Sequence, residues 1–125
     1  MNRRTLFKQS LIYILLLWTP SYANEEKEHE MAVNLIITFK IKKEKLTSFM
    51  QIVKELKVNL PKVKGCKGVK IFQAEDDKNT ITFVETWVSI EAHKKHIEYV
   101  VSSGSWEKIA SHLESDPSSN YYHEL

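Results

Sequence analysis

The sequence contains little cysteine, glycine or proline. Among its 125 residues there is one cysteine, Cys66, with three glycines and three prolines. A single cysteine cannot form an internal disulfide and cannot supply a multi-cysteine zinc or iron–sulfur site. With 42% hydrophobic and 27% charged residues, the chain is neither fibrous nor disordered, and its length predicts one folded domain.

The chain also has almost equal numbers of basic and acidic residues, and the small excess of basic residues lies at the N-terminus. The formal net charge is +2. Residues 1–23 carry three basic residues and no acidic ones, followed by an apolar run over residues 11–18, then Pro20 and the small residues Ser21 and Ala23. This layout is typical of a secretory signal peptide cleaved near Ala23. We therefore expect an exported protein, periplasmic or secreted, whose charge is −1 after cleavage.

A membrane anchor is the alternative interpretation of the same segment. The apolar run over residues 11–18 would be about 12 Å long as a helix, against roughly 30 Å for a bilayer core. We therefore expect no membrane association after cleavage, and the near-neutral charge gives no reason to expect a nucleic-acid partner.

The pattern of the remaining chain predicts a leader and one domain. Residues 24–31 are charged and without an apolar face, so we expect a solvated leader, with the domain over residues 32–125. Strand-like alternation covers residues 33–41, 69–75 and 80–88. Helical spacing covers residues 46–60, which Pro61 ends, and residues 90–101, which Ser89 caps. A short helix over residues 106–113 and a final strand over residues 120–125 complete the prediction.

The order β-α-β-β-α-β is that of a ferredoxin-like α+β sandwich, in which both helices cover one face of a four-stranded sheet. The other face of the sheet should carry Ile36, Val84 and Val88. Such a face is too apolar to remain exposed to water. We therefore expect a homodimer that packs sheet to sheet.

Several short motifs resemble the antibiotic biosynthesis monooxygenase (ABM) superfamily, and its quinol monooxygenases most. They are the turn Gly65-Cys66, a strand that ends in Glu85-x-Trp87, the helix-initiating Ser89, and His96 nine residues after the tryptophan. The resemblance implies a dimeric α+β barrel with a small pocket in each subunit. It also implies oxidation of a small phenol or quinol by O₂ without a metal or organic cofactor.

The sequence departs from this pattern at Val101, where many quinol-type members have a second histidine. Ser103-Gly104-x-Trp106 is similar to members whose activity is unassigned. Haem-degrading relatives use an asparagine of the first strand with a tryptophan and a histidine. Here Asn34 lies too early in the chain relative to the helix that follows, and the spacing to His96 is one residue shorter than this pattern requires. We rank it below the quinol reading.

The candidate catalytic residue is His96, because removing a proton from a phenol requires a base that titrates near neutral pH. It lies at the border of the apolar helix stripe, so it could equally rest at the seam between helix and sheet. The candidate substrate-binding residues are Trp87, Glu85, Phe83, Tyr99 and Trp106. Glu85 could instead pair with a basic residue across the dimer, and the aromatic residues could be packing.

Three other side chains have a structural interpretation that we prefer. His93 lies inside the apolar stripe and is expected to be a packed core histidine. His93 and His96 could share a metal ion, but no third ligand is close in sequence, so we expect no metal site. Cys66 could be a reactive thiol, although a small turn residue is the simpler interpretation.

Two functions remain open at this point. The first is a cofactor-independent monooxygenase acting on a small phenol or quinol, with a haem-degrading enzyme as a weaker variant. The second is a non-catalytic dimeric module that binds a small apolar ligand on the same fold. They differ in whether Trp87, His96 and Glu85 meet around one enclosed cavity.

Overall fold

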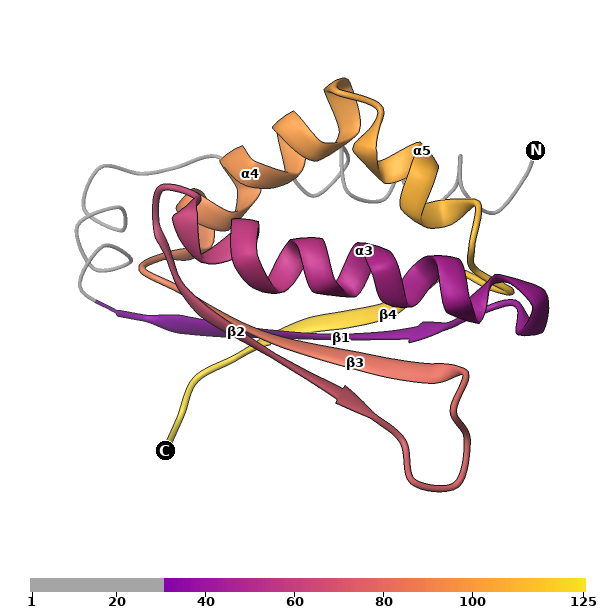
Figure 1. Cartoon of the computed structure of the whole chain (residues 1–125). Helices are drawn as coiled ribbons and strands as arrows, with labels where there is room; N and C mark the ends of the chain where they lie inside the picture. The colour runs from indigo at the N-terminus through magenta and orange to yellow at the C-terminus, as the bar shows by residue number, and fades with distance from the viewer. Residues whose placement is uncertain (1–30) are drawn as a thin grey trace.

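The computed structural model describes residues 31–125, so the predicted signal peptide and nearly all of the predicted leader lie outside the described residues. The elements follow in the predicted order (Figure 1). They are β1 (Val33–Lys40), a 3₁₀ turn at Lys43–Lys45, α3 (Leu46–Asn59), a second 3₁₀ turn at Leu60–Lys62, β2 (Cys66–Gln73), β3 (Thr80–Trp87), α4 (Ile90–Ser102), α5 (Ser105–Ala110) and β4 (Ser118–Tyr122). No helix within residues 31–125 has the length and apolar character needed to cross a bilayer.

The four strands form one antiparallel sheet in the order β2-β3-β1-β4. The helices α3, α4 and α5 all lie over the same face, which leaves the other face open (Figure 1). This is the predicted ferredoxin-like α+β fold. In the single chain the sheet is open at both edges, so closure into a barrel would require a second copy.

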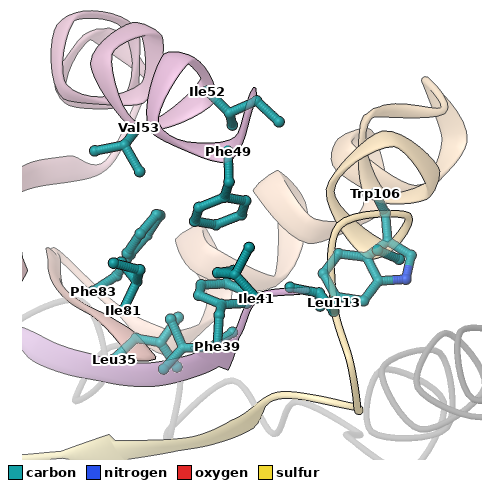
Figure 2. Packing of buried hydrophobic residues seen from close by; sticks show 12 residues of the cluster. Leu35, Phe39, Ile41, Phe49, Ile52, Val53, Ile81, Phe83, Trp106 and Leu113 are labelled. Atoms are coloured by element: carbon teal, nitrogen blue, oxygen red, sulfur yellow. The ribbon is translucent and has the colours of Figure 1, made fainter. Parts of the chain in front are cut away.

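Strand period explains how the core forms. Val33, Leu35, Ile37 and Phe39 alternate along β1 and all are buried, whereas the residues between them are half-buried. Such alternation places every second side chain on the helix-covered face. In Figure 2 Leu35 and Phe39 of β1 point toward Phe49 and Val53 of α3, and Phe39 lies 5.1 Å from Phe83, ring centroid to centroid.

Two local signals in the sequence set the boundaries of the helices. Ser89 begins α4 as predicted, because its Oγ accepts a hydrogen bond of 3.1 Å from the backbone N–H of Ala92. Pro61 falls in the 3₁₀ turn that follows α3, which ends at Asn59. The N-terminus of α4 and the end of α3 border the site described below.

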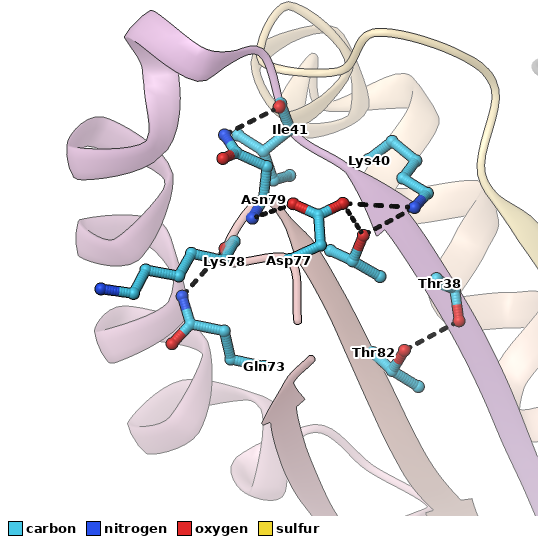
Figure 3. A network of polar contacts seen from close by, with 9 residues as sticks. Thr38, Lys40, Ile41, Gln73, Asp77, Lys78, Asn79 and Thr82 are labelled. Carbon is cyan, nitrogen blue, oxygen red and sulfur yellow. Dashed lines mark hydrogen bonds and ion pairs between the residues drawn. The ribbon is translucent and has the colours of Figure 1, made fainter. Parts of the chain in front are cut away.

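The hairpin between β2 and β3 is held by Asp77, as Figure 3 shows. Its carboxylate accepts hydrogen bonds from the backbone N–H of Asn79 at 3.0 Å and from the Thr80 hydroxyl at 2.8 Å. These donors, the Thr80 hydroxyl first, lower the pKa of Asp77 from its usual value. The Asn79 side chain then donates to the carbonyl of Ile41 at 3.1 Å, which ties the hairpin to the end of β1.

The open face of the sheet is only partly apolar. Ile36 and Val84 lie opposite one another at its centre and are half-buried. Polar pairs flank them: Thr38 and Thr82 share a hydrogen bond of 2.8 Å (Figure 3), and Thr86 donates to Asn34 at 2.8 Å. The expectation that Val88 belongs to this face is wrong, because Val88 follows the end of β3 and lines a hollow beside α4.

Candidate active site

A cavity of about 420 Å³ lies between the sheet and the helices. Its floor comes from β1 and β3, one wall from the end of α3, and the roof from α4 and α5. Its walls are mostly aliphatic and aromatic, and they include Leu35, Phe83, Leu56, Val100 and Trp106. The volume is near the lower end of the range for small-molecule sites, so the cavity can hold a small ligand.

Glu85 is the carboxylate in this cavity. Strand alternation turns it to the same face as Ile81, Phe83 and Trp87, and only 8% of its surface is exposed. Burial raises the pKa of Glu85 to about 7, and the hydrogen bond from Trp87 offsets part of that rise. Near neutral pH the group therefore exists in both its protonated and ionised forms, which suits proton transfer. No salt bridge involves Glu85 within residues 31–125, and its side chain faces the helices, on the opposite side of the sheet from the open face through which a second copy is expected to pack.

Trp87 supports the site from behind. It is fully buried, its indole N–H donates to Oε1 of Glu85 at 2.9 Å, and its ring packs 5.3 Å from His93 and 5.2 Å from His96. It is not among the described residues that line the cavity. Trp87 is thus a core anchor that contacts three groups of the site, and it lies behind the residues that line the cavity.

His96 lies on α4 and is half-buried. Its ring stacks on the Trp87 ring with an interplanar angle of 32° and lines the cavity. Burial lowers the pKa of His96 from its usual value, so its imidazole is neutral at neutral pH. Of the two interpretations left open for His96, the structure agrees with a cavity position.

A second, outer hollow of about 570 Å³ lies beside the start of α4. It is lined by Gly65, Val88, Ala92 and Lys95 among others, and it shares Val63, His96 and Tyr99 with the cavity. These three side chains therefore stand between the outer hollow and the cavity. Tyr99 is 67% exposed, so the tyrosine is the most accessible of the predicted substrate-binding residues.

The remaining predicted residues also gather here. Phe83 and Trp106 are buried and line the cavity from β3 and α5. Glu85, Phe83, His96, Tyr99 and Trp106 thus border one space, and Trp87 contacts two groups of that set.

His93 is a site residue that the sequence pattern assigned to the core. It lies on α4 with 4% of its surface exposed, and its Nδ1 is hydrogen-bonded to the Tyr121 hydroxyl at 2.7 Å. Its other ring nitrogen, Nε2, is buried and has no hydrogen-bond partner among residues 31–125, and the side chain lines the cavity. Burial lowers the pKa of His93 to about 3, so the ring is neutral. The predicted burial of His93 is confirmed. The hydrogen bonding expected of a buried histidine is found at Nδ1 only.

Within residues 31–125 no group of three potential ligands is placed to hold a metal ion, so the His93–His96 pair has no third partner there. Asn34 lies on the open face, bonded to Thr86, on the opposite side of the sheet from the cavity. The asparagine, tryptophan and histidine of the haem-degrading interpretation are therefore not assembled in one place.

Cys66 begins β2 and is half-buried. Burial raises the pKa of its thiol, and the Sγ–H donates weakly to the carbonyl of Gly68 at 3.7 Å. Because the thiolate is the reactive form, these surroundings favour the structural interpretation of Cys66.

Residues 32–98 match the antibiotic biosynthesis monooxygenase family, which is more than half of the chain, and the chain belongs to that family. No protein with a curated description matches it.

Solved structures with the same fold come from several organisms. A conserved protein from Methanosarcina mazei Go1 is 20% identical, with a TM-score of 0.68 and coverage of 80% of this chain and 99% of its own. A protein from Bordetella bronchiseptica classed with the antibiotic biosynthesis monooxygenases is 14% identical, with a TM-score of 0.66 and coverage of 76% and 98%. A Caulobacter crescentus protein of the same class is 16% identical, with a TM-score of 0.65 and coverage of 83% and 99%. At these identities the likeness extends to the fold alone.

Proposed function

We propose that the protein is a cofactor-independent monooxygenase that oxidises a small phenol or quinol with O₂ in the cavity between the sheet and α4. One observation carries this proposal: Glu85 and His96 border the same apolar cavity, and burial moves their pKa values in opposite directions. A pair of titratable groups whose environments shift their pKa values in this way can divide the roles of acid and base.

In the proposed reaction His96 is the base. Its neutral imidazole accepts the proton of the substrate hydroxyl, which leaves an electron-rich anion able to react with O₂. Glu85, still protonated in part near pH 7, gives a proton to the oxygen atom that leaves. The apolar walls keep bulk water away from the anion, and Trp87 fixes the orientation of both groups.

The chemistry balances without a further reductant. With a hydroquinone as substrate, a ring carbon loses hydrogen and gains a C–O bond, the O–O bond breaks, and the second oxygen atom leaves as water. The products are a hydroxyquinone and one water molecule. O₂ takes four electrons, two from the oxidation of quinol to quinone and two from the C–H bond, so the substrate supplies them all.

The proposal includes a homodimer formed through the open face of the sheet and an exported location after cleavage near Ala23. Support for the dimer comes from Ile36 and Val84 at the centre of that face and from the half-exposed Phe72 and Tyr122 at its margins. Sedimentation equilibrium tests it: Ile36→Lys should turn a dimer into a monomer, whereas Lys57→Glu on the opposite side should not. For the location, the N-terminal sequence of the protein recovered from its native host should begin at Asn24.

A non-catalytic ligand-binding module is the second candidate. It is favoured by the aliphatic character of the cavity walls and by Val101, which lines the cavity at the position where quinol-type relatives have a second histidine. On this account ligands would bind in the same cavity and leave unchanged.

Oxygen consumption over a panel of substituted hydroquinones separates the two candidates. We expect activity that falls as pH rises above about 7, because Glu85 then loses its proton, whereas spontaneous oxidation of a quinol accelerates with pH. His96→Ala and Glu85→Gln should each lower the rate by roughly 10²-fold or more. His123→Ala, on an exposed residue outside the cavity, should not change it. Ligand binding without oxygen uptake on any member of the panel would favour the binding module.

A further inference from the structure

Two buried histidines in this fold differ in a way that points to a ligand. His112 is 5% exposed and both of its ring nitrogens are bonded, Nε2 to the Ser48 hydroxyl and Nδ1 to the carbonyl of Lys108, each at 2.8 Å. His93 is 4% exposed, yet in the part of the chain that the structure describes its Nε2 has no hydrogen-bond partner. Because a buried polar atom without a hydrogen bond costs free energy, an exception of this kind needs an explanation.

The surroundings hold the His93 ring in one orientation. Tyr121 reaches it from β4, which pairs with β1 so that Tyr121 lies beside Leu35. The two rings meet edge to face with an interplanar angle of 81°, and the Trp87 ring also packs against the imidazole, at 5.3 Å between centroids. A ring held by a hydrogen bond and by two aromatic neighbours keeps Nε2 directed at one place, as a binding group requires.

The His93 side chain lines the cavity, so the other lining residues limit which ligand can reach Nε2. Among the described residues that line the cavity there is no lysine or arginine, and Glu85 is the carboxylate that faces it. An anionic ligand would have no counter-charge and would be repelled whenever Glu85 is ionised. The occupant should therefore be uncharged and mostly apolar.

We propose that Nε2 of His93 binds the hydroxyl group of a neutral aromatic ligand in this cavity, with Tyr121 as the positioning residue that holds the imidazole. A hydroxyl suits the site whichever ring nitrogen carries the proton. If the Tyr121 hydroxyl donates to Nδ1, then Nε2 carries the proton and donates a hydrogen bond to the ligand hydroxyl. If Nδ1–H donates to Tyr121, Nε2 accepts a hydrogen bond from the ligand hydroxyl. The inference rests on the proposed function in taking the cavity as the substrate site, but it concerns binding and needs no turnover.

Calorimetric titration of the full protein with a matched pair of ligands tests this role. The probes are 2-naphthol and 2-methylnaphthalene, which are similar in shape and differ in the hydroxyl. The wild-type protein should bind 2-naphthol more tightly, and His93→Leu should reduce that preference by about three- to tenfold, the value of one neutral hydrogen bond. Tyr121→Phe should reduce it by a smaller factor. Ile97→Val alters an apolar part of the wall and should weaken both ligands alike, so the preference stays.

An unchanged preference in a folded His93→Leu variant would overturn the proposal. If that variant does not fold, nitrogen-15 NMR of the wild-type histidines provides the test instead. Adding 2-naphthol should shift the Nε2 resonance of His93 and leave that of His112 in place, and an unmoved His93 resonance would equally overturn it. Failure here is separable from failure of the proposed function, since a hydroxyl preference that depends on His93 can exist without oxygen consumption.

Discussion

The indole N–H of Trp87 donates to Oε1 of Glu85 at 2.9 Å, although the two residues belong to the same strand. Residues two apart on a strand share a face, so β3 itself brings this donor and acceptor together. One neutral donor does not compensate for the loss of water around a carboxylate, and burial still raises the pKa of Glu85 to about 7. The strand thereby places a group able to hold or release a proton in an apolar cavity.

The free energy of unfolding should record the raised pKa of Glu85. A carboxyl whose pKa is higher in the folded state than the usual 4.5 stabilises the fold fully at low pH, and that contribution is lost as pH rises from about 4.5 to about 7. Glu85→Gln cannot ionise. Relative to the wild type, the variant should therefore gain about 2–3 kcal/mol between pH 5 and pH 8 in urea unfolding.

The comparison uses the difference in free energy of unfolding between Glu85→Gln and the wild type, measured at each pH. His93, whose pKa is lowered to about 3, destabilises the fold as pH falls below 6.5 and acts in the opposite direction. This term cancels in the comparison. Glu98→Gln, at an exposed position on α4, is the control. A Glu85→Gln variant whose relative stability is the same at both pH values would contradict the burial argument.

Trp87→Phe should raise the pKa of Glu85 above its value near 7, because the variant keeps the apolar surroundings but removes the hydrogen bond that lowers this pKa. Carbon-13 NMR of labelled glutamate carboxyl groups measures the midpoint directly. The smaller ring should also cost about 1–3 kcal/mol of stability. Trp106→Phe changes the same cavity without touching this bond, so its Glu85 midpoint should match the wild type. Equal midpoints in the wild type and Trp87→Phe would refute the role given to the indole.

Gly65 should tolerate alanine much less than Gly104 does. Both have a positive φ, +89° and +84°, so each substitution strains the backbone by about 1 kcal/mol. A Cβ at Gly65 would in addition lie 2.7 Å from the Cβ of Ala92 on α4, whereas one at Gly104 meets no atom of residues 31–125 within 4 Å. We expect Gly65→Ala to lose about 3 kcal/mol or more and Gly104→Ala about 1 kcal/mol in urea unfolding. Similar losses in both would show that the contact between the Gly65 turn and α4 does not matter.

Local patterns in the sequence were sufficient to predict the elements of the fold. Alternation along residues 33–40, the cap at Ser89 and the break at Pro61 depend on neighbouring residues, and all three are found. The bounds of the two edge strands, β2 and β4, were predicted less accurately. β2 begins at Cys66 and not at residue 69, and β4 begins at Ser118 and not at residue 120. Edge strands carry fewer apolar residues, so their ends are set by pairing with a neighbour more than by pattern.

The site was only partly predictable for the same reason. Strand period placed Glu85 and Trp87 on one face, and the helical wheel placed His96 near it. The bond between His93 and Tyr121 joins residues 28 positions apart and depends on β4 pairing with β1. No local pattern carries that information, so the sequence predicts only an ordinary core residue at His93. That Trp87 lies behind the cavity likewise follows from packing against both histidines.

The most direct test of the proposed monooxygenase uses ¹⁸O₂. The purified protein is incubated with a hydroquinone that it binds, and the product and water are analysed by mass spectrometry. The account predicts one labelled oxygen atom in the hydroxyquinone and the other in water, with the labelled product lost in His96→Ala and Glu85→Gln. An unlabelled quinone, or product formed no faster than in buffer alone, would contradict it.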